Sequence, residues 1–323
     1  MEPRRRVDRA LWAVVMEAYV SGVSTRKVDE LVAALGCESG ISKSEVSRIC
    51  QGLDTQVQAF LQRPLEFSHY PYVYLDATYL HGRDQARKQV ISRAVIVAVG
   101  ITANGQREVL GIEVGDSEDE AFWTAFLRRL RERGLSGVQL VISDAHAGLK
   151  KAIARCCQGS SWQRCRVHFA RNLLAKVPKG SQDMVAAALR SVFVQADAQA
   201  VEQQWDQVIG MLIEKFPAAA AMMAQAKDDV LAFRSSPPEH WRKIWSTNPL
   251  ERLNKEIKRR TRVVGIFPND PAITRLVGAL LLGQQEEWPL EGRRVFSELS
   301  MAKLESSNDP GQEQLTAALT AAA

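Results

Sequence analysis

The chain has 323 residues, of which 46% are hydrophobic and 24% charged, a balance typical of globular domains and unlike that of disordered or fibrous chains. This length corresponds to roughly two or three domains of about 100 to 200 residues each. The formal net charge is only +5. However, basic residues gather near positions 4–9, 128–133 and 252–262, and such clusters favour a polyanion as partner.

Membrane and secreted classes are disfavoured. Apolar runs such as Ala94 to Val99 are far shorter than the ~20 residues that a membrane span needs. The five cysteines are an odd, irregularly spaced set, unlike a secreted disulfide framework. The N-terminal stretch includes Glu17 and has no small-residue cleavage site, which argues against a signal peptide. We therefore expect a cytoplasmic protein with no membrane contact.

The first 66 residues have helical patterns. One helix is predicted to end near Val20, a second to run from Ser24 or Thr25 to Gly36, and a third to start after Ser42. Two short helices joined by a Gly- and Ser-containing turn are typical of a helix-turn-helix. Its second helix would present Lys43, Ser44, Glu45 and Ser47 to DNA. A plain three-helix bundle with solvated charges remains the alternative.

A strand period begins at Tyr72. The segments YVYLDATYL, QVISRAVIVAVGIT and REVLGIEVG predict an antiparallel meander, with turns at 82–84 and at Asn104-Gly105. The segment SEDEAFWTAFLRRLRERG predicts a helix with Ser117 as N-cap and Glu120 completing a capping box. The short apolar segment VQLVISD then predicts a buried parallel strand.

A helix over 149–156, a fifth strand around SWQRCRVHF and a further helix follow. This β-β-β-α-β-α-β-α order is that of an RNase H-like core, a mixed α/β sheet with flanking helices. An all-helical insertion is predicted from about Ser181 to Arg234, and the tail after about Ser297 is expected to fray. The predicted units are a helical DNA-binding region (1–66), the first part of the core (67–180), the insertion (181–238), the last part of the core (239–296) and the tail (297–323).

Two aspartates stand in segments otherwise suited to burial. Asp76 lies in or at the end of the first strand, and Asp144 ends the fourth. Ionised carboxylates are rarely buried unless they are paired or bind a metal. An isolated aspartate is more often a turn residue or a helix cap. In the predicted fold, however, the two strands are neighbours, and a divalent cation would relieve the repulsion between the carboxylates.

The segment STNPLERLNKEIKRR offers a third carboxylate. Pro249 suits the start of a helix that Thr247 or Asn248 would cap, so Glu251 falls in the first turn. Asn254, Lys255, Lys258 and Arg262 share its face by helical spacing. A first-turn acid can also simply complement the helix dipole. Glu256 is the competing carboxylate, but it lies on another side of the helix, among mixed charge.

Several segments closely resemble Mutator-type transposases of bacterial insertion sequences. They include LDATYLHGR, the run REVLGIEVGDSEDEAFWTAFLRRLRERGLSGVQLVISDAHAG, WQRCRVHFARNLL and EHWRKIWSTNPLERLNKEIKRRTRVVGIFPND. The resemblance covers residues from about 7 to 295. It implies a DDE transposase whose RNase H-like catalytic domain is interrupted by a helical insertion, with Asp76, Asp144 and Glu251 as catalytic residues.

The resemblance also marks Cys165 and His168 as a signature pair of the superfamily. A zinc site that adds Cys156 and Cys157 is disfavoured, because the sequence has no second pair at finger spacing. Members of the family usually carry several dozen residues ahead of the point where this chain begins, so we expect a shortened end-recognition region.

The expected activity is cleavage and strand transfer of DNA, with two Mg²⁺ or Mn²⁺ ions held by the three carboxylates. The expected partners are double-stranded DNA, as terminal inverted repeats and target, and further copies of the chain in a homodimer or larger synaptic assembly at the bacterial nucleoid. Two alternatives stay open: a truncated, inactive transposase that represses by binding DNA, and a general RNase H-like nuclease. The predicted DNA contacts are Lys43, Ser44, Ser47, Arg252, Asn254, Lys255, Lys258, Arg259, Arg260 and Arg262.

Overall fold

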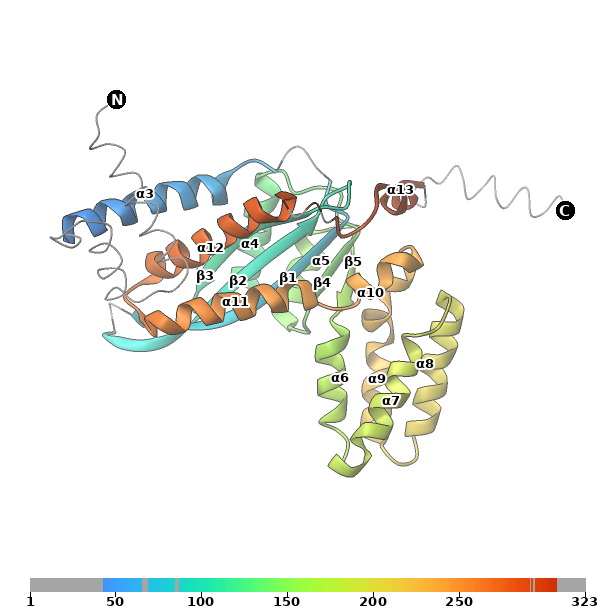
Figure 1. Ribbon diagram of the computed structural model, residues 1–323. Coiled ribbons are helices and arrows are strands. Elements are labelled where there is room, and N and C mark those ends of the chain that lie inside the picture. Colours follow the sequence, from blue (N-terminus) through green and yellow to red (C-terminus); the bar gives the residue numbers. More distant parts are fainter. Residues whose placement is uncertain (1–42, 66–68, 85–86, 291, 293, 307–323) are drawn as a thin grey trace.

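The computed structural model describes residues 43–65, 69–84, 87–290, 292 and 294–306, and within them it has a mixed α/β architecture (Figure 1). The helices predicted before residue 43 lie outside the described residues. None of the helices in the described part combines the length and the apolar character that crossing a membrane would require.

Within the described residues, a six-stranded sheet forms the centre of the fold. Its strands are β1 (Tyr72–Asp84), β2 (Gln89–Ile101), β3 (Arg107–Gly115), β4 (Leu140–Ser143), β5 (Ser161–Arg164) and β6 (Ile266–Phe267). The order is β3-β2-β1-β4-β5, and β6 pairs with the far end of β1. The first three strands form the predicted antiparallel meander. The predicted parallel strand, β4, lies between β1 and β5.

The turn predicted at 82–84 is wrong. β1 and β2 stay paired up to Asp84 and Gln89, with Gly82 opposite Ile91. A Cβ at Gly82 would lie 3.1 Å from Cγ of Arg93. The glycine therefore makes room for a cross-strand side chain and does not mark a turn.

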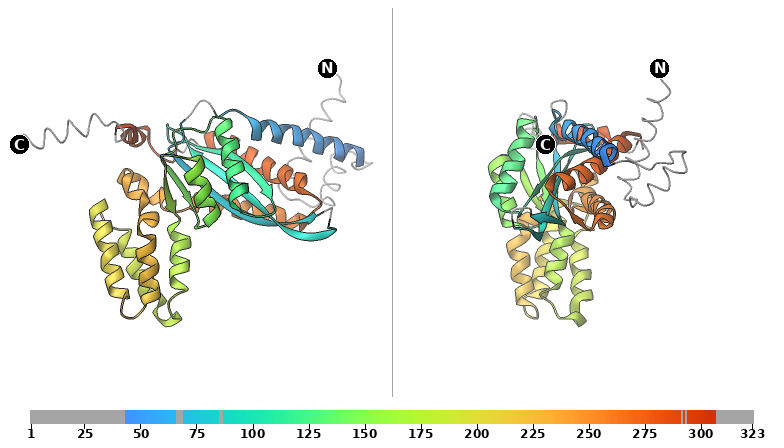
Figure 2. Two further views of the ribbon diagram at one scale, coloured as in Figure 1. Left: turned by 180° about the vertical axis from the view of Figure 1, so that it is seen from behind. Right: turned by 90° about the vertical axis from the view of Figure 1, so that its left-hand side faces the viewer.

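Helices cover both faces of the sheet. On one face lie α4 (Glu120–Glu132) and α5 (Ala147–Cys156); α11 (Asn248–Val264) and α12 (Asp270–Leu290) lie on the other, and α3 (Lys43–Gln62) packs against α12 (Figures 1 and 2). Side chains alternate along β1, because successive residues of a strand point to opposite faces. Val73 and Leu75 join the core beneath α4 and α5, and Tyr72 and Tyr74 join the core on the α11 side.

The N-cap of α4 is Asp119, so the predicted capping box of Ser117 and Glu120 is wrong. Oδ1 of Asp119 accepts a hydrogen bond from the backbone N of Phe122 at 2.8 Å. The hydroxyl of Ser117 donates to Oδ2 of Asp119 at 2.9 Å. Because the aspartate is the residue that reaches the free N–H groups of the first turn, the helix begins at Glu120.

The insertion is a helical bundle that extends from the β5 end of the sheet (Figure 1). Its helices are α6 (Arg166–Leu174), α7 (Gln182–Val192), α8 (Ala198–Leu212) and α9 (Pro217–Val230), with η1 (Lys179–Ser181) between the first two. Since α6 packs against α7 and α9, the bundle begins in space at Arg166, earlier than the predicted start at Ser181. The fully buried Gln163 of β5 fixes the bundle to the sheet: it donates to the carbonyl O of Val230 at 2.7 Å and accepts from the N of Phe233 at 2.8 Å.

The chain returns to the sheet through η2 (Ala232–Ser235), η3 (Pro238–His240) and α10 (Trp241–Ile244). After α12, a last helix, α13 (Glu298–Ser306), contradicts the expectation of a frayed tail for these residues. Its Met301 and Leu304 are three positions apart and buried in the core on the α11 side. Residues after Ser306 lie outside the described part.

Candidate active site

Asp76 lies within β1, and Asp144 directly follows β4, the parallel neighbour of β1. The ladder between β1 and β4 pairs Tyr72 with Leu140 and continues one-to-one to Tyr74 with Ile142. Continued for two more residues, this register would place Asp76 opposite Asp144. By strand alternation both side chains belong to the face that also carries Tyr74 and Ile142, which is the α11 side of the sheet.

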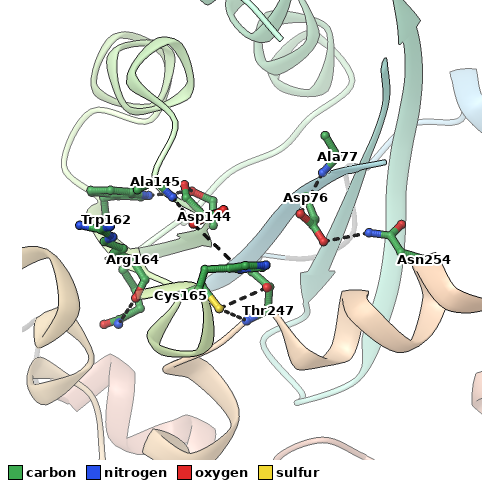
Figure 3. Close-up of polar contacts among 12 residues, drawn as sticks. Asp76, Ala77, Asp144, Ala145, Trp162, Arg164, Cys165, Thr247 and Asn254 are labelled. Atoms are coloured by element: carbon green, nitrogen blue, oxygen red, sulfur yellow. Dashed lines mark hydrogen bonds and ion pairs between the residues drawn. The ribbon is translucent and has the colours of Figure 1, made fainter. Parts of the chain in front are cut away.

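The carboxylate of Asp76 is partly buried and hydrogen-bonded on both oxygens. Its Oδ1 accepts from the backbone N of Ala77 at 3.0 Å, and its Oδ2 accepts from Nδ2 of Asn254 at 2.8 Å (Figure 3). Burial raises the pKa of Asp76 to about 6 against the effect of these bonds and of His168, and the charge of Asp144 adds to the rise. An aspartate that is costly to ionise beside a second carboxylate is typical of a functional site.

Asp144 follows the last residue of β4, and its side chain is 44% exposed. Oδ1 accepts from the backbone N of Ala145 at 2.6 Å. The backbone below it is fixed: the buried hydroxyl of Ser143 donates to the carbonyl O of Asp144 at 3.0 Å and accepts from Nε1 of Trp162 at 2.8 Å. A rigid strand end therefore presents an accessible carboxylate.

Glu251 lies in the first turn of α11, as predicted, and is half-buried. Thr247 is the N-cap, and its carbonyl O accepts from the backbone N of Glu251 at 3.0 Å. Asn254, one turn further along α11, reaches Asp76 (Figure 3). The early turns of this helix therefore lie beside the aspartates.

Some of the oxygen atoms at this site suit a hard cation such as Mg²⁺. Asp76 and Asp144 supply carboxylate oxygens, the ligands that Mg²⁺ prefers, and the buried Oδ1 of Asn254 has no hydrogen-bond partner within the described residues. Across those same ranges, no group of three His, Cys, Asp or Glu side chains is close enough together to hold a metal ion. The charges of Asp76 and Asp144 thus interact, while Asp76, Asp144 and Glu251 do not form a three-carboxylate cluster within the described residues.

The predicted DNA contacts of α11 differ in their exposure and in their partners. Arg252, Lys255, Lys258, Arg259 and Arg262 are exposed. Arg259 and Arg260 both donate to Glu256 at 2.7 Å and hold the pKa of that carboxyl at about 2.

Asn254 does not belong with these cations. It is only 7% exposed, and its amide serves Asp76. Helical spacing placed it near the face of Glu251, but packing against the sheet buries that edge of the helix.

Lys43, Ser44 and Ser47 lie in the first turns of α3. Their side chains are outside the described residues, so their role as DNA contacts stays a prediction.

Cys165 and His168 belong to the start of α6, not to a strand. Cys165 is the N-cap, fully buried, and its backbone N donates to the carbonyl O of Ser143 at 2.7 Å. Nδ1 of His168 lies 4.0 Å from Oδ1 of Asp144. Its interaction with the Cys165 thiol raises the pKa of His168 to about 9, partly opposed by burial and supported by the charges of Asp144 and Asp76.

The zinc alternative has no support in the described part of the chain. Cys156 packs in the opposite core, beneath α4, with Sγ 3.8 Å from the carbonyl O of Thr124. It therefore lies across the sheet from Cys165, whose sulfur faces Thr247.

Two neighbours of the site were missed from sequence. Thr247 contacts the sulfur of Cys165 (Figure 3), and Nε1 of Trp162 donates to the hydroxyl of Ser143. Thr247 had a local signal, since it precedes Asn-Pro at a helix start, but that signal predicts a cap and not a partner 82 residues away. Nothing in the local pattern around Trp162 indicates its partner.

The sequence matches known proteins along most of its length. A family profile described as "Transposase, Mutator family" matches residues 1–290. The transposase for insertion sequence element IS1081 of Mycobacterium tuberculosis is 46% identical over 320 residues, covering 98% of this chain and 76% of that protein.

Two further relatives are more distant. The transposase for IS256 in transposon Tn4001 of Staphylococcus aureus is 38% identical, covering 92% of this chain and 75% of that protein. The transposase for ISRM5 of Rhizobium meliloti is 40% identical, covering 92% and 73%. The chain therefore belongs to the Mutator family of transposases.

Proposed function

We propose that the chain is a DDE transposase with an RNase H-like catalytic core. It cleaves DNA at the ends of an insertion sequence and joins the freed strand to target DNA, with Asp76, Asp144 and Glu251 as the catalytic carboxylates. The observation that carries the proposal is the β1–β4 ladder, which pairs Tyr74 with Ile142 two residues before Asp76 and Asp144, on the face of the sheet that α11, the helix of Glu251, covers. The membership in a transposase family supports it.

Asp76 and Asp144 would hold one or two Mg²⁺ or Mn²⁺ ions, with Glu251 as the third carboxylate from the adjacent helix. When bound, the ions supply Lewis-acid stabilisation of a phosphodiester displacement and lower the pKa of the attacking water. Asn254 orients Asp76 through its 2.8 Å hydrogen bond and keeps one carboxylate oxygen in a fixed direction. The 44% exposure of Asp144 leaves that side of the site open to substrate.

The exposed cations of α11 would bind the DNA backbone. Lys255, Lys258 and Arg262 follow Glu251 by four, seven and eleven positions, so they extend along one side of the helix from the carboxylate. The N-terminal region, including the start of α3, would supply sequence readout. Two ends and one target must meet in one reaction, so we propose a homodimer or larger synaptic assembly.

Removing the three cations should weaken DNA binding in a salt-dependent way. For Lys255→Ala, Lys258→Ala and Arg262→Ala combined, we expect the slope of log K against log salt to fall by about 2 to 3, because each phosphate contact contributes ~0.9. Fluorescence anisotropy with duplex DNA over a range of KCl concentrations measures this slope. Arg128→Ala and Arg131→Ala, exposed on α4 at the other face of the sheet, are the matched controls. Equal slopes for the two sets of variants would contradict this role of α11.

The activity is tested with supercoiled plasmid that carries the inverted repeats flanking the gene. We expect nicking at the repeat ends and joining of the 3′ ends to a second DNA, both dependent on Mg²⁺ or Mn²⁺. Binding without cutting under either ion would favour the repressor alternative. Cutting with no preference for the repeats would favour the general nuclease. Unchanged cutting after substitution of all three carboxylates would refute the site.

A further inference from the structure

The N-cap of α11 makes an unusual contact. An N-cap threonine normally accepts a hydrogen bond from the first turn of its own helix, but the side chain of Thr247 makes no such bond. Its hydroxyl and its backbone N instead both reach Sγ of Cys165, at 3.4 Å each (Figure 3). Both residues are fully buried. The side chain of Thr247 therefore does not cap α11 and instead links the start of this helix to a segment distant in the sequence.

Cys165 is also tied to the strand that carries Asp144. Its backbone N donates to the carbonyl O of Ser143 at 2.7 Å, one residue before that aspartate. On the other side, the carbonyl O of Thr247 accepts from the backbone N of Glu251 at 3.0 Å. A short chain of hydrogen bonds thus runs from the end of β4, through Cys165 and Thr247, to the first turn of α11.

The chemistry of this link depends on sulfur. Sγ is a weak but large acceptor; here it is buried and meets both the N–H and the O–H of Thr247, and it also interacts with the ring of His168. If serine replaced Cys165, its shorter C–O bond would leave the oxygen further from Thr247 than Sγ is. An oxygen acceptor, however, needs its donor to be closer than a sulfur acceptor does. Alanine would leave the N–H and O–H of Thr247 buried without partners, which is the costly outcome for polar groups.

We propose that Cys165 is a positioning residue for DNA cleavage: it holds the first turn of α11, and with it Glu251, at a fixed place relative to Asp144. The inference rests on the proposed function for its catalytic consequence. It follows from the geometry, because Cys165 contacts the elements that bear two of the carboxylates and is not itself one of the ligands. A displacement of about 1 Å at a reacting group can lower a rate about 100-fold.

The first test separates rate from binding. For Cys165→Ala we expect the single-turnover nicking rate on inverted-repeat DNA to fall at least about 30-fold, with the half-saturating protein concentration changed less than about twofold. Thr247→Val, which removes only the hydroxyl, should lower the rate about tenfold, and Thr247→Ser, which retains it, should stay near wild type. Cys156→Ala, a buried cysteine of the opposite core, is the control and should nick normally.

The second test does not require cleavage. Hydrogen exchange of the full chain should show faster exchange in Cys165→Ala and Thr247→Val at the amides of Leu250 and Glu251, with the rest of α11 unchanged. The double variant should be no slower in nicking than Cys165→Ala alone, because both substitutions break one link.

Normal nicking by Cys165→Ala and Thr247→Val would overturn the proposal. So would exchange that rises equally over the whole molecule, since that indicates a general loss of stability. If wild type itself does not nick, the proposed function fails, and the exchange result still decides whether the link holds the first turn of α11.

Discussion

Replacing Asp76 with Asn is expected to abolish DNA cleavage and, in the metal-free protein, to increase stability at neutral pH. The folded-state pKa of about 6 lies above the ordinary value of 3.8, so the folded state holds its proton more tightly than the unfolded chain does. The contribution of Asp76 to stability is therefore most favourable below pH 4 and is lost as pH rises through 6. At pH 7.5 the ionised carboxylate opposes folding by up to about 3 kcal/mol.

The asparagine variant removes this charge and can keep a hydrogen bond to Asn254. The Oδ1 of Asn254 is buried without a partner in the described part of the chain, so a flip of its amide would offer an acceptor to the new amide group. In urea unfolding with EDTA, we expect the variant to be about 1 to 2 kcal/mol more stable than wild type at pH 7.5, and the two proteins to converge below pH 4.

Added Mg²⁺ or Mn²⁺ provides the control. A ligand that binds only the folded state raises its stability in proportion to the logarithm of concentration. Thermal unfolding should therefore shift upward with metal for wild type and much less for Asp76→Asn. An asparagine variant that is less stable at every pH, or that gains the same shift with metal, would contradict the assignment of Asp76.

Replacing Glu251 with Gln is expected to lower the nicking rate about 1000-fold or more, because metal-assisted displacement depends on several kcal/mol of charge stabilisation. DNA affinity should stay nearly unchanged, since the cations of α11 remain. Stability should fall by no more than about 1 kcal/mol, the largest usual contribution of a first-turn acid to the helix dipole. Single-turnover nicking assays and urea unfolding on the same preparation measure both effects.

Glu256→Gln is the matched control on the same helix. Glu256 pairs with Arg259 and Arg260 and has no expected role with metal, so its nicking rate should stay within about threefold of wild type. An equal loss of nicking rate in Glu251→Gln and Glu256→Gln would indicate that the total charge of α11, and not the carboxylate of Glu251, determines the rate. A Glu251→Gln variant that loses stability and still nicks would leave only the helix-dipole role for this residue.

The meander, the parallel β4 and the helical insertion could be predicted because their signals are local. Period-2 patterns and β-branched residues fixed the meander, and the short apolar segment before Asp144 indicated burial on both faces. The wrong predictions arose where another residue or a strand pairing competed with the local sequence pattern. Asp119 displaced Ser117 as the cap of α4 because it reached the same N–H groups, and the pairing of β1 with β2 carried the strand past Gly82.

The sequence by itself determined the types and order of the elements, the carboxylates Asp76, Asp144 and Glu251 as candidates, and the placing of Glu251 in the first turn of a basic helix. These depend on side-chain period, capping preference and family resemblance, which are readable along the chain. Only the tertiary structure decided that Asn254 serves Asp76 and that Cys165 joins β4 to α11. Both contacts link residues 82 or more positions apart. Such pairs depend on how the faces of helices and strands pack, because a buried polar group must hydrogen-bond to a partner that the fold places beside it.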